Sequence, residues 1–76
     1  MNNQRRMKLK KIINSLYDII GLIESVASEE EDYMNNMPEN LQGSDKYGRA
    51  EEVCEYLEDA IADIESAIEN IDEARV

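Results

Sequence analysis

Apolar residues recur along this chain at alternating steps of three and four, and this spacing limits the possible folds more than any other feature. A repeat of this kind is the a/d seam of a heptad, and it predicts a long amphipathic helix. In the first half of the chain the seam is interrupted only at Glu30. It consists of Leu9, Ile13, Leu16, Ile20, Ile23, Ala27 and Met34. A further apolar row, at the g positions, consists of Ile12, Ile19, Val26 and Tyr33.

The second half of the chain shows the same period, again with three apolar rows. The a row is Ala50, Leu57, Ile64 and Ile71, the d row is Val53, Ala60, Ala67 and Ala74, and the e row is Tyr47, Cys54, Ile61 and Ile68. A single antiparallel neighbour covers about two rows of a helix, so the third row of each helix is surplus. We expect Ile12, Ile19 and Val26 on the first helix, and Cys54, Ile61 and Ile68 on the second, to remain in water in a lone hairpin.

Residues 37–43 separate the two periodic stretches and contain proline, asparagine and glycine, which favour a turn. Pro38 should end the first helix, because a proline pushes the preceding residue out of helical geometry. Ser44 is the expected N-cap of the second helix, with Asp45 in its first turn. The prediction is a single all-α domain over residues 1–76, an antiparallel coiled-coil-like hairpin with helices at about 3–36 and 44–74. Leu41 is expected to plug the turn end.

Charge is distributed unevenly, although the formal net charge is −10 from 18 acidic and 8 basic residues. The first eleven residues contain five bases and no acid. They are Arg5, Arg6, Lys8, Lys10 and Lys11. An antiparallel hairpin places this segment beside the acidic end of the second helix and near the negative end of its dipole. Charge balance within the hairpin is the favoured interpretation, and a tail for nucleic acid or for a membrane is the less favoured one.

Residue types that carry catalysis or bind metals are scarce. The chain has no histidine, and its one cysteine, Cys54, is interpreted as a small core residue beside carboxylates. The acidic run at residues 29–32 lacks the spacing and the central glycine of a calcium loop. We predict no enzymatic activity, no metal and no cofactor. A single cysteine, no leader-like segment and no apolar run long enough for a membrane favour a cytoplasmic location.

The surplus apolar rows predict a protein–protein interaction module. Covering them would stabilise a small domain, at roughly 25 cal/mol per Å² of apolar surface. A homodimer of hairpins that forms a four-helix bundle is the favoured solution, and a surface on a different protein is the other one. The residues predicted for self-association are Ile12, Ile13, Leu16, Ile19, Ile20, Ile23, Val26, Leu57, Ile61, Ile64, Ile68 and Ile71.

The acidic surface of the second helix permits an alternative function. Carboxylates spaced along a rod can imitate a nucleic-acid backbone and occupy the groove of a basic host protein, as in anti-restriction or anti-CRISPR inhibitors. Solubility is the simpler and preferred explanation, because glutamate is also a good helix former. The residues of this partner-binding surface would be Glu51, Glu52, Glu55, Glu58, Asp59 and Asp63.

The turn and the second helix also carry a resemblance. MPENLQGSDKYGRAEE, at residues 37–52, is followed by EDAIADIESAIENIDEA. Together these segments resemble a group of short acidic proteins of bacterial and phage genomes, which have a long first helix, a Pro-Glu-(Asn/Ser)-Leu-Gln turn and an acidic second helix. The first helix matches only loosely. The resemblance implies a helical hairpin and a phage or mobile-element setting, and it implies no activity and no site residue.

Overall fold

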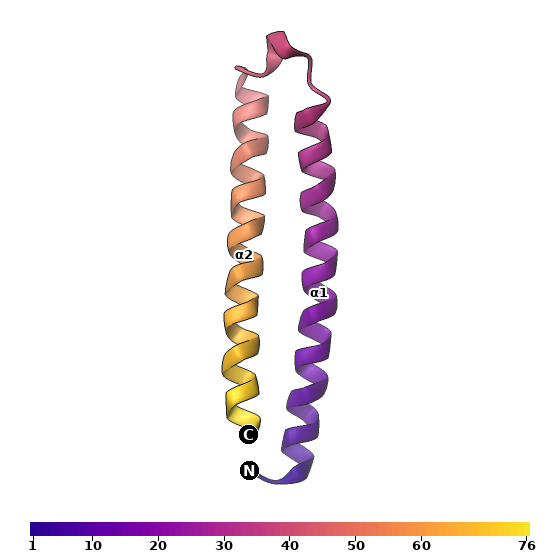
Figure 1. Cartoon of the computed structure of the whole chain (residues 1–76), viewed down its shortest axis with the longest axis vertical. Coiled ribbons are helices and arrows are strands. Elements are labelled where there is room, and N and C mark those ends of the chain that lie inside the picture. The colour runs from indigo at the N-terminus through magenta and orange to yellow at the C-terminus, as the bar shows by residue number, and fades with distance from the viewer.

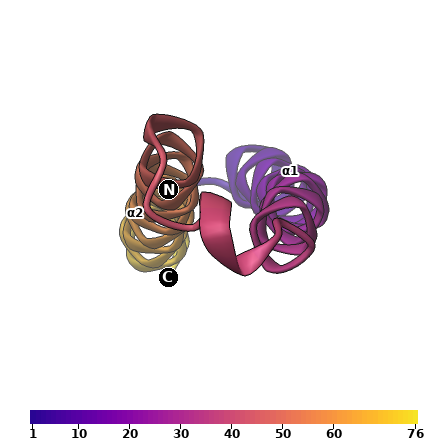
Figure 2. The ribbon, with the colours of Figure 1, turned by 90° about the horizontal axis from the view of Figure 1, so that it is seen from above.

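In the computed structural model, which describes residues 1–76, the chain forms a hairpin of two long helices without strands (Figure 1). Helix α1 spans Asn3–Asn35 and helix α2 spans Asp45–Arg75, with a 3-10 turn, η1, at Glu39–Leu41 between them. The helices run antiparallel and side by side, so the two termini share one end of a body that measures 60 × 15 × 11 Å (Figures 1 and 2). The predicted all-α hairpin is confirmed.

Local side chains set the ends of both helices. Asn2 caps α1, because its side-chain oxygen accepts a hydrogen bond from the backbone N–H of Arg5 at 2.8 Å. Helix α1 stops at Asn35, since Pro38 has a fixed φ and restricts the residue before it. Ser44 caps α2 as predicted, and its hydroxyl oxygen accepts a hydrogen bond from the N–H of Tyr47 at 3.4 Å.

The core is a narrow seam between the helices, and it is densest toward the terminal half of the hairpin. Ile13, Ile20 and Ile68 are 5–8% exposed and pack together as one cluster. The only other buried residue is Ala50. The partly buried residues that pack against the cluster are Leu16, Ile61, Ile64 and Ile71. A seam with four buried residues leaves much of the apolar surface of both helices in water.

Helix α2 packs a row into the seam that the sequence analysis placed in water. The expectation that Cys54, Ile61 and Ile68 remain in water is wrong, because Ile68 is buried, Ile61 packs against the core and Cys54 is half-buried. An isoleucine buries far more apolar area than an alanine, so α2 turns its isoleucine row into the seam. The row on the other side of the seam is half-buried at Val53, Ala60 and Ala67 and exposed at Ala74.

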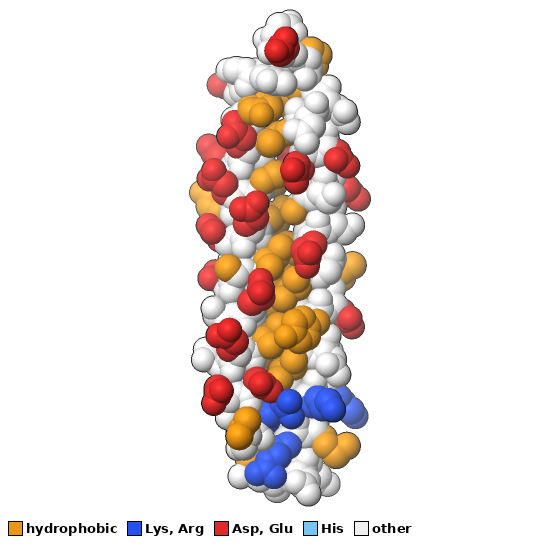
Figure 3. All heavy atoms as spheres, in the orientation of Figure 1, with side chains coloured by type: hydrophobic (Ala, Val, Ile, Leu, Met, Phe, Trp, Pro, Cys, Tyr) orange, Lys and Arg blue, Asp and Glu red, His pale blue; other side chains and the backbone are white.

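Of two expectations about the ends of the hairpin, one is wrong and one is confirmed. Leu41 does not plug the turn, because its side chain is 47% exposed. No ion pair joins the two helices, since both pairs, Arg49–Glu52 and Arg75–Asp72, form between residues three apart within α2. The basic start of α1 nevertheless lies beside the end of α2, as predicted, at the end that holds the termini (Figure 3). The antiparallel orientation therefore follows from the short turn and the apolar seam, not from direct pairing of charges.

Candidate functional site

One edge of the seam is apolar on both helices. Tyr33 of α1 and Lys46 of α2 line the same cavity at the turn end. Tyr33 belongs to the row of Ile12, and Lys46 lies seven residues before Val53, so these two rows lie on one side of the hairpin. Residues seven apart share a helix face, and this places the rest of each row on the same side. We call this edge the apolar face. It consists of an isoleucine flank on α1, Ile12, Ile19, Val26 and Tyr33, and an alanine flank on α2, Val53, Ala60, Ala67 and Ala74.

The apolar face is exposed along α1, whereas Val53, Ala60 and Ala67 on α2 are half-buried. The exposed fractions of its α1 side chains run from 43% at Ile19 to 52% at Val26. Two further side chains widen the face. Leu22 lies three residues after Ile19 and four before Val26, and it is 69% exposed. Tyr56 lies in the same way between Val53 and Ala60, and it is 64% exposed. Single exposed apolar residues are ordinary, whereas a continuous strip along both helices is typical of an interaction surface.

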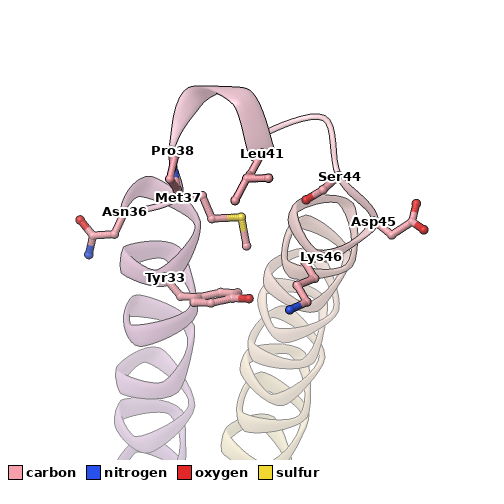
Figure 4. A pocket seen from close by; sticks show the side chains of 8 residues that line it. All are labelled: Tyr33, Asn36, Met37, Pro38, Leu41, Ser44, Asp45 and Lys46. Atoms are coloured by element: carbon pink, nitrogen blue, oxygen red, sulfur yellow. The ribbon is translucent and has the colours of Figure 1, made fainter.

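The strip continues into an open cavity of about 740 Å³ beside the turn (Figure 4). The ring of Tyr33 lies across this space toward Lys46, and the thioether of Met37 lies between Tyr33 and Leu41. Asn36 and Asp45 point away from it (Figure 4). The interior of the cavity is thus mainly apolar, and we regard it as the end of the apolar face, not as a separate polar site.

The opposite edge of the seam is acidic on both helices, and we call it the acidic face. Burial, and then the charges of Glu30, Glu31 and Glu58, raise the pKa of the Cys54 thiol. The thiol therefore stays protonated at neutral pH. Figure 3 shows acidic side chains along both sides of a central apolar stripe. By the heptad spacing the acidic face consists of Glu24 and Glu31 of α1 and Glu51, Glu58, Glu65 and Asp72 of α2.

The structure divides the residues predicted for self-association into two groups. Only three of them, Ile12, Ile19 and Val26, lie on the apolar face. The other nine belong to the seam or pack along it, and they are Ile13, Leu16, Ile20, Ile23, Leu57, Ile61, Ile64, Ile68 and Ile71. The sequence analysis missed Leu22 and Tyr56 as members of the face. Their steps of three and four from the flank residues were the signal that could have identified them.

The predicted acidic surface is exposed at every position but does not form one line. Glu51 and Glu58 border the seam, whereas Glu52, Glu55, Asp59 and Asp63 spread round the outer half of α2. No group of three or more histidine, cysteine or acidic side chains comes together in a way that could hold a metal ion. Neither helix has an uninterrupted apolar stretch of the length needed to cross a membrane.

Comparisons with family models, with curated proteins and with solved structures find no match to this chain. The proposal below therefore rests on the geometry of the hairpin.

Proposed function

We propose that this chain is a non-enzymatic protein–protein interaction module that self-associates through its exposed apolar surface. The observation that carries the proposal is the exposure of that surface, because Ile12, Ile19 and Val26 are 43–52% exposed and Leu22 is 69% exposed. The hairpin has an accessible surface of 5874 Å², whereas a compact monomer of 8.7 kDa exposes about 4,700 Å². The excess of about 1,100 Å² includes polar surface and follows from the elongated shape, and it is larger than the roughly 800 Å² that each partner buries in a standard protein–protein interface.

The small core supports the same proposal. Domains below about 70–80 residues seldom obtain more than about 3–5 kcal/mol from one hydrophobic core, and this hairpin buries four residues. It has no disulfide to compensate, since Cys54 is its only cysteine. Association with a partner would supply the missing apolar burial, and a second hairpin would complete a four-helix bundle.

Sedimentation equilibrium of the full chain at micromolar concentration tests this function. We expect a mass close to twice 8.7 kDa, with a helical circular dichroism spectrum. Thermal unfolding should also shift to lower temperature on dilution, because dissociation of the dimer removes stability by mass action. A well-folded chain that sediments as a single copy over the whole range would contradict the proposal.

A second candidate function is inhibition of a basic nucleic-acid-binding protein. It is supported by the acidic side chains predicted on α2, which are all exposed, and of which only Glu52 has an ion-pair partner. Reversal of Glu55, Glu58 and Asp59 to lysine should abolish binding to a basic nuclease while the helical spectrum is kept. Binding that survives the reversal, or no binding by the unmodified chain, would remove this candidate. We also propose a cytoplasmic location and a phage or mobile-element origin. Their support is the composition of the sequence and the resemblance of the turn and α2.

A further inference from the structure

We infer that a second copy of this chain covers the apolar face, and that the isoleucine flank of each hairpin lies on the alanine flank of the other. This inference rests on the proposed self-association and specifies its surface and its geometry. The buried residues of the seam, Ile13, Ile20 and Ile68, are already covered within one hairpin, so they cannot be the contact that joins two hairpins.

The seam shows on which side cover is missing. On α1, Ile13 and Ile20 are buried, whereas Leu16 and Ile23 are only half-buried. Leu16 and Ile23 lie three or four residues from Ile19, so they are the seam residues next to the isoleucine flank. A hairpin packed on the apolar face would finish the burial of both.

Charge excludes the opposite edge as the place for a second copy. Two acidic faces in contact would bring carboxylates against carboxylates, and burying like charges is strongly unfavourable. The isoleucine flank and the alanine flank themselves contain no acidic residue, and the acidic seam residue beside them, Glu30, lines a cavity with the bases Lys46 and Arg49. The charge pattern therefore directs association to one edge.

The two flanks of the apolar face have side chains of complementary size. Ile12, Ile19 and Val26 form a bulky row, and Ala60 and Ala67 in the other row are small. A two-fold axis parallel to the helices lays α1 of one copy on α2 of the other, so that bulky side chains meet small ones, as in well-packed cores. Both turns then lie at the same end of the dimer.

The margins of the face agree with this arrangement. Leu22 on α1 and Tyr56 on α2 extend the face at about the same height along the hairpin, so the two-fold rotation brings Leu22 of one copy toward Tyr56 of the other. One heptad closer to the turn, the same margins carry Glu29 and Arg49, which are opposite in charge. An arrangement with turns at opposite ends would stack the isoleucine flanks on each other and the alanine flanks on each other.

Two substitutions on α1 with the same chemistry test the face. Ile19→Glu places a carboxylate in the middle of the apolar face, whereas Tyr17→Glu places one at an exposed position on the acidic side. We expect Ile19→Glu to weaken self-association more than about 100-fold and Tyr17→Glu to leave the dimer intact, with helical spectra checked for both. A wild-type chain that is monomeric overturns the proposed function. A wild-type dimer that survives Ile19→Glu overturns only the assignment of the face.

Disulfide trapping tests the geometry. In a Cys54→Ala background, one chain carries Ile19→Cys and a second carries Ala60→Cys, and the two are mixed and oxidised with diamide. We expect the mixed disulfide to exceed either symmetric product, because Ile19 of one copy should face Ala60 of the other. Symmetric products in excess would overturn the stacking of isoleucine flank on alanine flank. Addition of Ile19→Glu to the second chain should abolish the mixed product.

Discussion

The two edges of the seam border the same core, yet they have opposite chemistry. On the apolar face, Ile19 and Val26 of α1 stand beside the alanine row of α2. On the acidic face, the charges of Glu31 of α1 and Glu58 of α2 both raise the pKa of Cys54, and acidic side chains line both sides of the seam (Figure 3). The comparison teaches that the hairpin is open on one side only. A second hairpin can cover the apolar face, and the two acidic faces would then point outward.

This asymmetry has a consequence for the size of the assembly. A self-complementary contact with two-fold symmetry is used up when two copies meet, so it gives a closed dimer. Repulsion between acidic faces opposes the stacking of further copies on the outside. A hairpin with two apolar edges would have no such limit and would associate into larger bundles or aggregates.

The largest expected effect is a loss of unfolding free energy that differs between the neighbouring residues Ile19 and Ile20. Ile20→Ala removes a buried seam residue and should lower the free energy of unfolding by about 2–5 kcal/mol at every protein concentration. Ile19→Ala, at a 43% exposed position, should change a lone hairpin by less than about 1 kcal/mol and should lower stability only where the chain is dimeric. Urea unfolding at several protein concentrations measures both. Equal effects at all concentrations would contradict the distinction between seam and face.

A smaller effect is expected at the single thiol. Replacing Glu31 and Glu58 with glutamine removes two charges that raise the pKa of Cys54, so the pKa should fall and the thiolate fraction at a given pH should rise. Alkylation by iodoacetamide at pH 8 should then become faster, by up to about tenfold, because one unit of pKa is a tenfold change in thiolate. Glu55→Gln is the control, since Glu55 is not among the groups that raise this pKa. An unchanged rate would show that the two glutamates do not meet across the seam.

The raised pKa of Cys54 also makes the stability of the hairpin depend on pH. Because the folded thiol has a raised pKa, the folded state favours the protonated form. Its contribution to stability is complete below the ordinary thiol pKa and is lost as the pH rises through the raised value. The Glu31→Gln, Glu58→Gln variant should therefore lose less stability than the wild type between neutral and alkaline pH, as followed by thermal unfolding.

The smallest expected effect comes from one charge on the acidic face. Glu24→Lys places a base opposite the acidic row of α2 and should raise the free energy of unfolding by about 0.2–1 kcal/mol at low salt. The gain should shrink as salt screens the charges. Asp18→Lys is the control, because it makes the same change in net charge on the outer side of α1. Neither Asp18 nor Glu24 has a charged residue three or four positions away. A salt-dependent gain for Asp18→Lys equal to that of Glu24→Lys would contradict the position of the acidic face.

Much of the fold could be predicted because its signals are local. The end of α1 before Pro38, the Ser44 cap and the length of both helices follow from residues close in sequence. The rotation of α2 about its own axis is not local, since it depends on which side chains fit against α1. Heptad spacing alone does not rank Ala60 against Ile61; both are half-buried, and Ile61 is the one that packs against the buried cluster. For this reason the sequence predicted the kind of surface correctly in α1 and misplaced it in α2.

The central claim is that two hairpins pack side by side across the apolar face. Small-angle X-ray scattering of the wild-type chain, at a concentration where it self-associates, tests this claim most directly. We predict twice the mass of one chain with a maximum dimension still close to the 60 Å length of a single hairpin. The mass of one chain at all concentrations, or a doubled mass with a clearly greater length, would contradict it.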